Sequence, residues 1–147
     1  RRPQGNDRDQ VKAIYEGLCD IAIINNYYFG KLKYSEDPVQ REWAKSMRLT
    51  FPNQEEGDRG AHINISGGGV AKHSKNKESA IKLLEFLSNS KSQKMYSEIN
   101  FEYPVNVKVE PSEELVSWGN FREDKISIEK IAQLSIDAQK IIDRVGW

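Results

Sequence analysis

The sequence has 147 residues, of which 37% are hydrophobic, and its 22 basic residues balance 22 acidic ones. This length and composition predict a folded domain with a hydrophobic core and exclude a disordered chain. The balanced charge gives no electrostatic reason to expect nucleic acid or an anionic membrane as partner. No stretch approaches the roughly 20 apolar residues of a transmembrane segment.

The first predicted element is a helix that starts at Asp7 and ends near Gly17. Asp7 is expected to cap this helix, because Gln10 three residues later completes a capping-box pattern. The apolar face follows helical spacing and comprises Val11, Ile14, Tyr15 and Leu18. Residues 20–24 then form a short, nearly continuous apolar run, which is typical of a strand buried on both faces.

The middle of the chain is predicted to alternate between helix, strand and loop. Two asparagines, Asn25 and Asn26, end the first strand, because this residue type tolerates turn conformations. A helix of about nine residues is expected from Pro38, which favours the first helical position. Its inward side chains are predicted to be Val39, Trp43 and Met47. Further strands are predicted at residues 48–51, 61–65 and 70–71, with a polar loop at residues 53–60.

The second half of the chain is predicted to be mostly helical, apart from an extended stretch at residues 101–109. The residues expected to begin or cap its helices are Asn76, Ser90, Ser112 and Ser135. This order of elements predicts an α/β architecture with a covered sheet that has too few strands to be complete. The chain also starts at Arg1 without an initiator Met. We therefore interpret it as a piece of a longer protein whose amino-terminal half, missing here, carries the other strands.

The sequence contains no convincing catalytic constellation. Cys19 could pair with His62 or His73 as a thiol and an imidazole, but Cys19 is interpreted as a small apolar filler between a helix end and a buried strand. Two histidines without other ligands at metal spacing do not make a zinc motif. The glycine-rich residues 66–69 lie too far before the next helix to cradle a phosphate, and we interpret them as a strand crossing near a hinge. The protein is therefore not expected to be an enzyme.

Tyr27 and Tyr28 are the most informative side chains. Adjacent residues on one strand point to opposite faces, but after two asparagines the backbone can turn, and neighbouring side chains in a turn or first helical residue can converge. Loops after the carboxyl ends of parallel strands are where open α/β sheets bind ligands. Two phenolate oxygens would suit ferric iron, a hard cation that prefers anionic oxygen donors. Packing remains the alternative role of the pair.

At residues 23–28, Ile-Ile-Asn-Asn-Tyr-Tyr, the sequence closely resembles the ferric-iron-binding proteins of bacterial ABC importers. This transferrin-like group lies within the class II periplasmic binding proteins. Supporting similarity runs along nearly the whole chain, at residues 3–8, 60–67, 76–87, 102–105 and 144–147. The resemblance implies two α/β lobes joined by crossing strands. It divides this carboxy-terminal half into residues 1–57 of the carboxy-terminal lobe, residues 58–108 returning to the amino-terminal lobe, and residues 109–147 packing back as helices.

The resemblance also implies the chemistry of the site. Tyr27 and Tyr28 match the paired tyrosinate ligands of Fe(3+), and the other ligands come from the amino-terminal half. Asn25 and Arg8 lie where some members hold a synergistic anion, carbonate or phosphate. Asp7 departs from the small amide found in those members and is therefore interpreted first as a helix cap. His62 and Tyr103 are expected to be structural.

The implied function is capture of ferric iron in the periplasm and its delivery to an ABC permease in the inner membrane, without catalysis. The lobes are expected to close over the metal as a shift between open and closed populations. Two alternatives stay open. The chain could belong to a class II binding protein for an organic or oxyanion solute, with stacking or hydrogen-bonding tyrosines, or it could be a structural or interaction domain whose tyrosines only pack.

Overall fold

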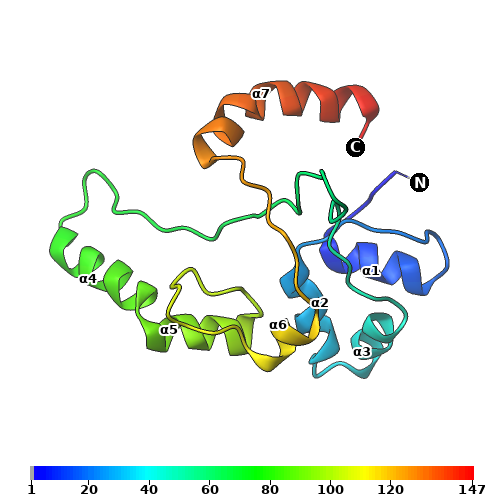
Figure 1. Cartoon of the computed structure of the whole chain (residues 1–147), viewed down its shortest axis with the longest axis horizontal. Coiled ribbons are helices and arrows are strands. Elements are labelled where there is room, and N and C mark those ends of the chain that lie inside the picture. Colours follow the sequence, from blue (N-terminus) through cyan, green and yellow to red (C-terminus); the bar gives the residue numbers. More distant parts are fainter. Residues whose placement is uncertain (1) are drawn as a thin grey trace.

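The structure is a computed structural model that describes residues 2–147. Its elements are α1 (Asp7–Tyr15), α2 (Asn26–Lys33), α3 (Pro38–Lys45), α4 (Lys77–Ser88), α5 (Ser90–Met95), the π-helix η1 (Tyr96–Asn100), α6 (Glu113–Ser117) and α7 (Ile128–Val145). Figure 1 shows α1, α2 and α3 gathered together, whereas α4 lies away from them and α7 stands apart at the top. Two long extended segments, one before α4 and one before α7, pass close to each other in the middle of the molecule.

The predicted strands do not form within the part of the chain that the structure describes. The single ladder contact there is a parallel bridge between Ala61 and Glu123. Residues 20–24, predicted as a doubly buried strand, are extended but unpaired, and Ile21 and Ile23 are 86% and 75% exposed. A strand is stabilised by its neighbours, so an extended run with no described segment beside it has no ladder to join. The predicted strands at residues 48–51, 61–65 and 70–71 were wrong for the same reason.

The hydrophobic core joins the first three helices. Val11 of α1, Leu32 of α2 and Ala44 of α3 are its buried members. Four half-buried side chains pack around them, namely Ile24, Phe29, Trp43 and Met47. The inward orientation predicted for Trp43 and Met47 is confirmed, but Val39 is 53% exposed and faces outward. Because α2 contributes the central leucine, the helix that carries the two tyrosines is held on one side by this core.

Several predicted helix caps lie one or more residues from the caps in the structure. The α1 cap is Asn6, whose Oδ1 accepts hydrogen bonds from the backbone N–H groups of Arg8 and Asp9, so the prediction for Asp7 was wrong. Asn89 rather than Ser90 caps α5, and Ser127 rather than Ser135 caps α7. Each error has the same source: short polar side chains near a helix start are interchangeable in sequence, and only the backbone decides which one reaches an N–H group.

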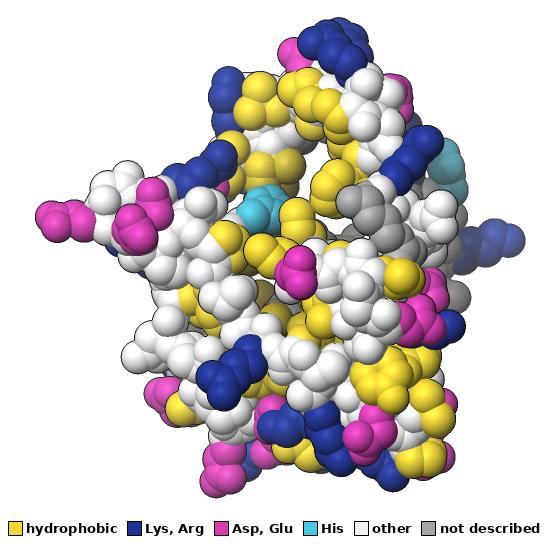
Figure 2. Space-filling view, turned by 90° about the vertical axis from the view of Figure 1, so that its right-hand side faces the viewer, with side chains coloured by type: hydrophobic (Ala, Val, Ile, Leu, Met, Phe, Trp, Pro, Cys, Tyr) yellow, Lys and Arg dark blue, Asp and Glu magenta, His cyan; other side chains and the backbone are white. Residues whose placement is uncertain are grey.

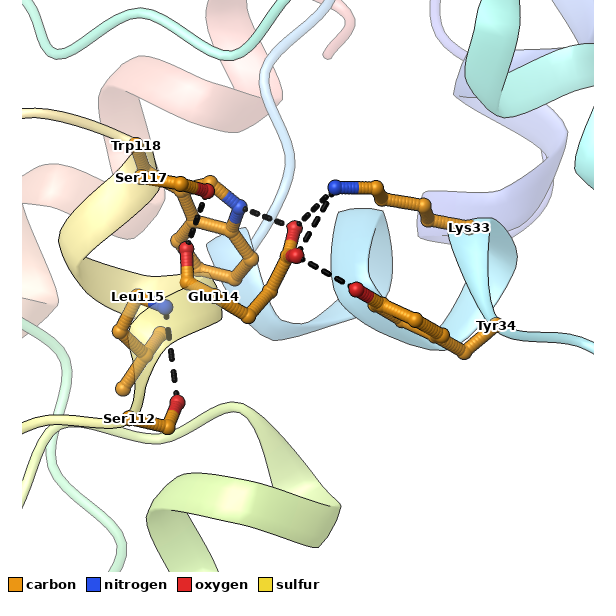
Figure 3. A network of polar contacts seen from close by, with 7 residues as sticks. All are labelled: Lys33, Tyr34, Ser112, Glu114, Leu115, Ser117 and Trp118. Atoms are coloured by element: carbon orange, nitrogen blue, oxygen red, sulfur yellow. Dashed lines mark hydrogen bonds and ion pairs between the residues drawn. The ribbon is translucent and has the colours of Figure 1, made fainter.

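A half-buried carboxylate joins α2 to α6 (Figure 3). Glu114 of α6 accepts hydrogen bonds from Lys33 Nζ at 2.7 and 2.8 Å, from the Tyr34 hydroxyl at 2.7 Å and from Trp118 Nε1 at 2.9 Å. Only 12% of the Glu114 side chain is exposed. Burial alone would raise the pKa of this carboxyl, but the hydrogen bonds from Lys33, Tyr34 and Trp118 outweigh burial and lower it. The carboxyl end of α2 is thereby tied to α6.

A glycine permits a second close contact on the same helix. Gly30 of α2 is buried directly against the ring of Phe101, and a Cβ at this position would collide with that ring. Phe101, which has φ 58°, also stacks on Tyr34 with ring centroids 5.4 Å apart. Phe101, which directly follows η1, therefore packs closely against α2.

Backbone hydrogen bonds join the two extended segments near one end. Ala61 N–H donates to Arg122 O, and Asp124 N–H donates to Ala61 O, both at 2.8 Å. The Arg122 guanidinium donates to three backbone carbonyl oxygens of the loop that precedes Ala61, those of Asn53, Glu55 and Asp58. This confirms the loop predicted at residues 53–60, which the hydrogen bonds of one arginine hold closed.

Large apolar side chains remain exposed on the other elements. The described helices α4 and α7 bury no residue completely, although both are amphipathic. Their exposed members include Leu83, Phe86, Ile136, Ile141 and Val145. Figure 2 shows hydrophobic side chains gathered around the opening beneath α7, at the top of the view. Nothing in the described helices is long and apolar enough to span a membrane.

Candidate metal centre

Tyr27 and Tyr28 lie in the first turn of α2, immediately after the unpaired run that ends at Asn25. Their ring centroids are 4.3 Å apart and the ring planes are inclined by 31°. Neighbouring positions on a helix do not normally face each other, so this close approach is a feature of the helix start. The structure therefore brings the two phenol groups together, as predicted for a turn or first helical residue.

Two cations flank the tyrosine pair. The Arg8 guanidinium of α1 lies 5.8 Å from the centroid of the Tyr28 ring, and Lys31 Nζ lies 4.8 Å from the centroid of the Tyr27 ring. Both distances fit cation–π contacts. Arg8 was predicted near the site from sequence. Lys31 was missed, although its spacing of four residues from Tyr27 on one helix was a signal that could have identified it.

The environment of Tyr27 favours the neutral phenol in the metal-free protein. Its hydrogen bond with the Tyr28 hydroxyl is the largest cause, followed by burial and by the nearby charges of Asp7 and Glu102. Together these raise the pKa of Tyr27 from 10.0 to about 12. A metal that uses this oxygen as phenolate must therefore displace a tightly held proton, and binding should release that proton to solvent.

This environment makes a prediction for the metal-free protein. Tyr28→Phe removes the hydrogen bond that contributes most to the shift, so the pKa of Tyr27 should fall from about 12 towards 10.0. An absorbance titration of tyrosinate at alkaline pH measures this directly, with Tyr15→Phe as a control on an exposed tyrosine of α1. An unchanged titration of Tyr27 in the Tyr28→Phe protein would contradict the hydrogen bond.

Asn25 links three segments at the start of the tyrosine helix. Its backbone N–H and its side-chain Nδ2 both donate to Asp7 Oδ1, at 2.7 and 3.1 Å. Its own Oδ1 accepts a hydrogen bond from Asn64 Nδ2 at 3.3 Å. Asp7 thus holds the turn before α2 instead of capping α1. The role predicted for Asn25 and Arg8 towards an anion remains a prediction.

The other residues considered from sequence lie elsewhere. His62 borders an open pocket of about 530 Å³ lined by residues 62–65, residues 123–126 and the start of α7, and the tyrosines do not line it. Cys19 is half-buried and not in a disulfide. Tyr103 packs edge-on against Phe121 and donates to Leu115 O, as expected for a structural tyrosine. Among residues 2–147, no three His, Cys, Asp or Glu side chains group to hold a metal.

Known proteins similar to this chain bind iron. The chain is 41% identical over 147 residues to Iron uptake protein A1 of Synechocystis. It is 49% identical to the ferric iron-binding protein A of Mannheimia haemolytica solved in an open conformation, with 99% of the chain covered and a TM-score of 0.88. Its homologues are ferric-iron-binding proteins. No protein-family model matches the chain.

A third similar protein was solved with iron bound. The Trichodesmium protein, described as in complex with iron and citrate ligands, is 45% identical and matches 100% of the chain with a TM-score of 0.89. The chain spans less than half of each of these relatives: 40% of the Synechocystis protein, 45% of the Mannheimia protein and 46% of the Trichodesmium protein. Along that part, the similarity is continuous.

Proposed function

We propose that this chain is part of a periplasmic ferric-iron-binding protein that captures Fe(3+) and delivers it to an ABC permease in the inner membrane. The observation that carries the proposal is the convergence of Tyr27 and Tyr28, whose ring centroids lie 4.3 Å apart. Nearly the whole chain is matched by homologues named as iron uptake or ferric-iron-binding proteins. The proposed architecture is the two-lobed α/β fold of class II periplasmic binding proteins, and no catalytic step is involved.

The division of the chain follows from this architecture. Residues 1–57 would form part of the carboxy-terminal lobe around the core of α1, α2 and α3. Residues 58–108 would return to the amino-terminal lobe and residues 109–147 would pack back. The exposed apolar side chains of α4 and of residues 20–24 support this division, because they offer surface and strand edges that a second half could cover.

The proposed binding chemistry uses both phenolate oxygens. Fe(3+) would displace the protons of Tyr27 and Tyr28 and would bind the two oxygens as phenolates. Because each phenolate that binds releases a proton, affinity should weaken as the pH falls. Two phenolates leave coordination positions open, so the remaining ligands would come from the other lobe as it closes.

We also propose that a small anion completes the coordination sphere of the metal. The citrate in the Trichodesmium structure supports a small carboxylate beside the metal, and carbonate and phosphate remain candidates. Arg8, whose guanidinium lies 5.8 Å from the centroid of the Tyr28 ring, could pair with such an anion. Asn25 is a second candidate donor, because its side-chain amide carries two hydrogens and the bond to Asp7 uses one of them.

A visible-absorbance titration with ferric citrate tests the proposal. The full-length protein that carries this chain is expected to develop a phenolate-to-iron charge-transfer band that saturates with added iron. The 147-residue chain by itself should give a weaker band or none, because it lacks ligands from the other lobe. A full-length protein that stays colourless and instead is stabilised by an organic solute would favour the alternative function of solute binding.

A further inference from the structure

The carboxylate of Asp7 has an arrangement that the proposed chemistry does not use. Asp7 is the first residue of α1, and its Oδ1 accepts two hydrogen bonds from one residue, Asn25, which lies 18 positions further along the chain. One of these bonds, from the backbone N–H at 2.7 Å, is short, as expected for a charged acceptor. The helix that contains Asp7 is capped by Asn6 without its help.

Asn25 in turn sets the start of the tyrosine helix. It occupies the residue before α2, and its carbonyl oxygen accepts the first hydrogen bond of that helix from Tyr28 N–H at 3.1 Å. Its side chain makes no capping bond to α2, because both polar ends are engaged elsewhere, with Asp7 and with Asn64. The orientation of the Asn25 peptide is therefore fixed from α1.

We propose that Asp7 is a positioning residue for the iron site, which acts through Asn25 to hold the first turn of α2 with the two phenol groups together. This inference rests on the proposed iron-binding function. Asp7 does not touch the metal; it fixes the backbone from which the ligands project. Partners that orient metal ligands in this way typically contribute 10- to 100-fold to affinity.

Two substitutions separate the hydrogen bonds from other effects. Asp7→Asn keeps an Oδ1 that can accept both bonds from Asn25, whereas Asp7→Ala removes the acceptor. In the full-length protein, Asp7→Ala is expected to weaken ferric iron binding by roughly 10- to 100-fold in competition with citrate. The charge-transfer band should also shift, since the phenolates would sit differently on the metal. Asp7→Asn should restore affinity to within a few-fold of the parent and restore the band position.

Asp9→Ala provides the matched control. Asp9 lies on the same turn of α1, where it accepts a hydrogen bond from Asn6 N–H at 2.8 Å in the capping box, but it makes no bond to Asn25. This variant weakens α1 and should leave affinity within a few-fold of the parent. The unfolding midpoint of each metal-free variant in urea shows that all four proteins are folded when iron is added.

The outcomes distinguish this role from the proposed function itself. If the parent protein gives no charge-transfer band, the iron-binding function fails, and the role of Asp7 fails with it. If the parent binds iron and Asp7→Ala binds equally well, only the positioning role is overturned. The same holds if Asp7→Asn is as weak as Asp7→Ala, or if Asp9→Ala reproduces the loss and the band shift, because α1 as a whole would then be responsible.

Discussion

Replacing both Tyr27 and Tyr28 by Phe is expected to reduce ferric iron affinity by several orders of magnitude and to abolish the charge-transfer band. Only the two hydroxyl oxygens are removed, so the ring contact at 4.3 Å and the packing of α2 should persist. Phenylalanine offers no oxygen to a hard cation, and the neighbouring cations Arg8 and Lys31 would then repel Fe(3+) without compensation. Equilibrium competition with citrate on the full-length protein measures the loss.

The single variants and a control make this result specific. Tyr27→Phe and Tyr28→Phe should each lose most of the affinity, because each removes one of two adjacent ligands. Tyr15→Phe changes a half-exposed tyrosine on α1 and should bind iron as the parent does. Iron binding that survives in the double variant would show that the pair packs or stacks and would refute the assignment of the ligands.

Leu32→Ala is expected to destabilise the protein by about 2–5 kcal/mol, the range for emptying a fully buried leucine site. Leu32 is 0% exposed and lies between α1 and α3 in the core. Since typical total stabilities are only about 5–15 kcal/mol, the loss is large. Urea unfolding of the metal-free protein measures it as a lower midpoint at an unchanged slope.

Val39→Ala is the matched control for that experiment. Sequence periodicity predicted Val39 to point inward on α3, but its side chain is 53% exposed. Its truncation should therefore change the free energy of unfolding by no more than about 0.5 kcal/mol. A cost similar to that of Leu32→Ala would mean that Val39 packs in the core, as sequence periodicity predicted, and would contradict its exposed position.

The local signals in the sequence predicted helices much better than strands. Helices at residues 7–15, 38–45 and 77–88 were predicted from spacing, prolines and polar starts, all of which act within a few residues. The last helix was predicted to begin at Ser135, yet Ile128, Ile131 and Leu134 continue its apolar spacing backwards to the true cap at Ser127. The predicted strands required partners from distant segments, which no local pattern supplies.

In the candidate site, too, features set by neighbouring residues were predictable from the sequence, and features set by distant contacts were not. The convergence of Tyr27 and Tyr28 followed from the asparagines before them, because that information is local. The role of Asp7 could not be predicted, since its bonds to Asn25 depend on how α1 and α2 meet in space. Resemblance to ferric-iron-binding proteins predicted that the pair are ligands, whereas the residues alone favoured the usual packing role of tyrosine.

The contacts at both ends of α2 have a consequence for the thermodynamics of capture. Asp7 holds the amino-terminal end through Asn25, and Glu114 holds the carboxyl end through Lys33 and Tyr34. Two phenols fixed on so short a span lose little conformational entropy when a cation arrives, because folding has already ordered them. In the proposed iron site, an incoming ion would meet two already ordered oxygen donors first, and its residence time would depend on the further ligands that complete the coordination shell.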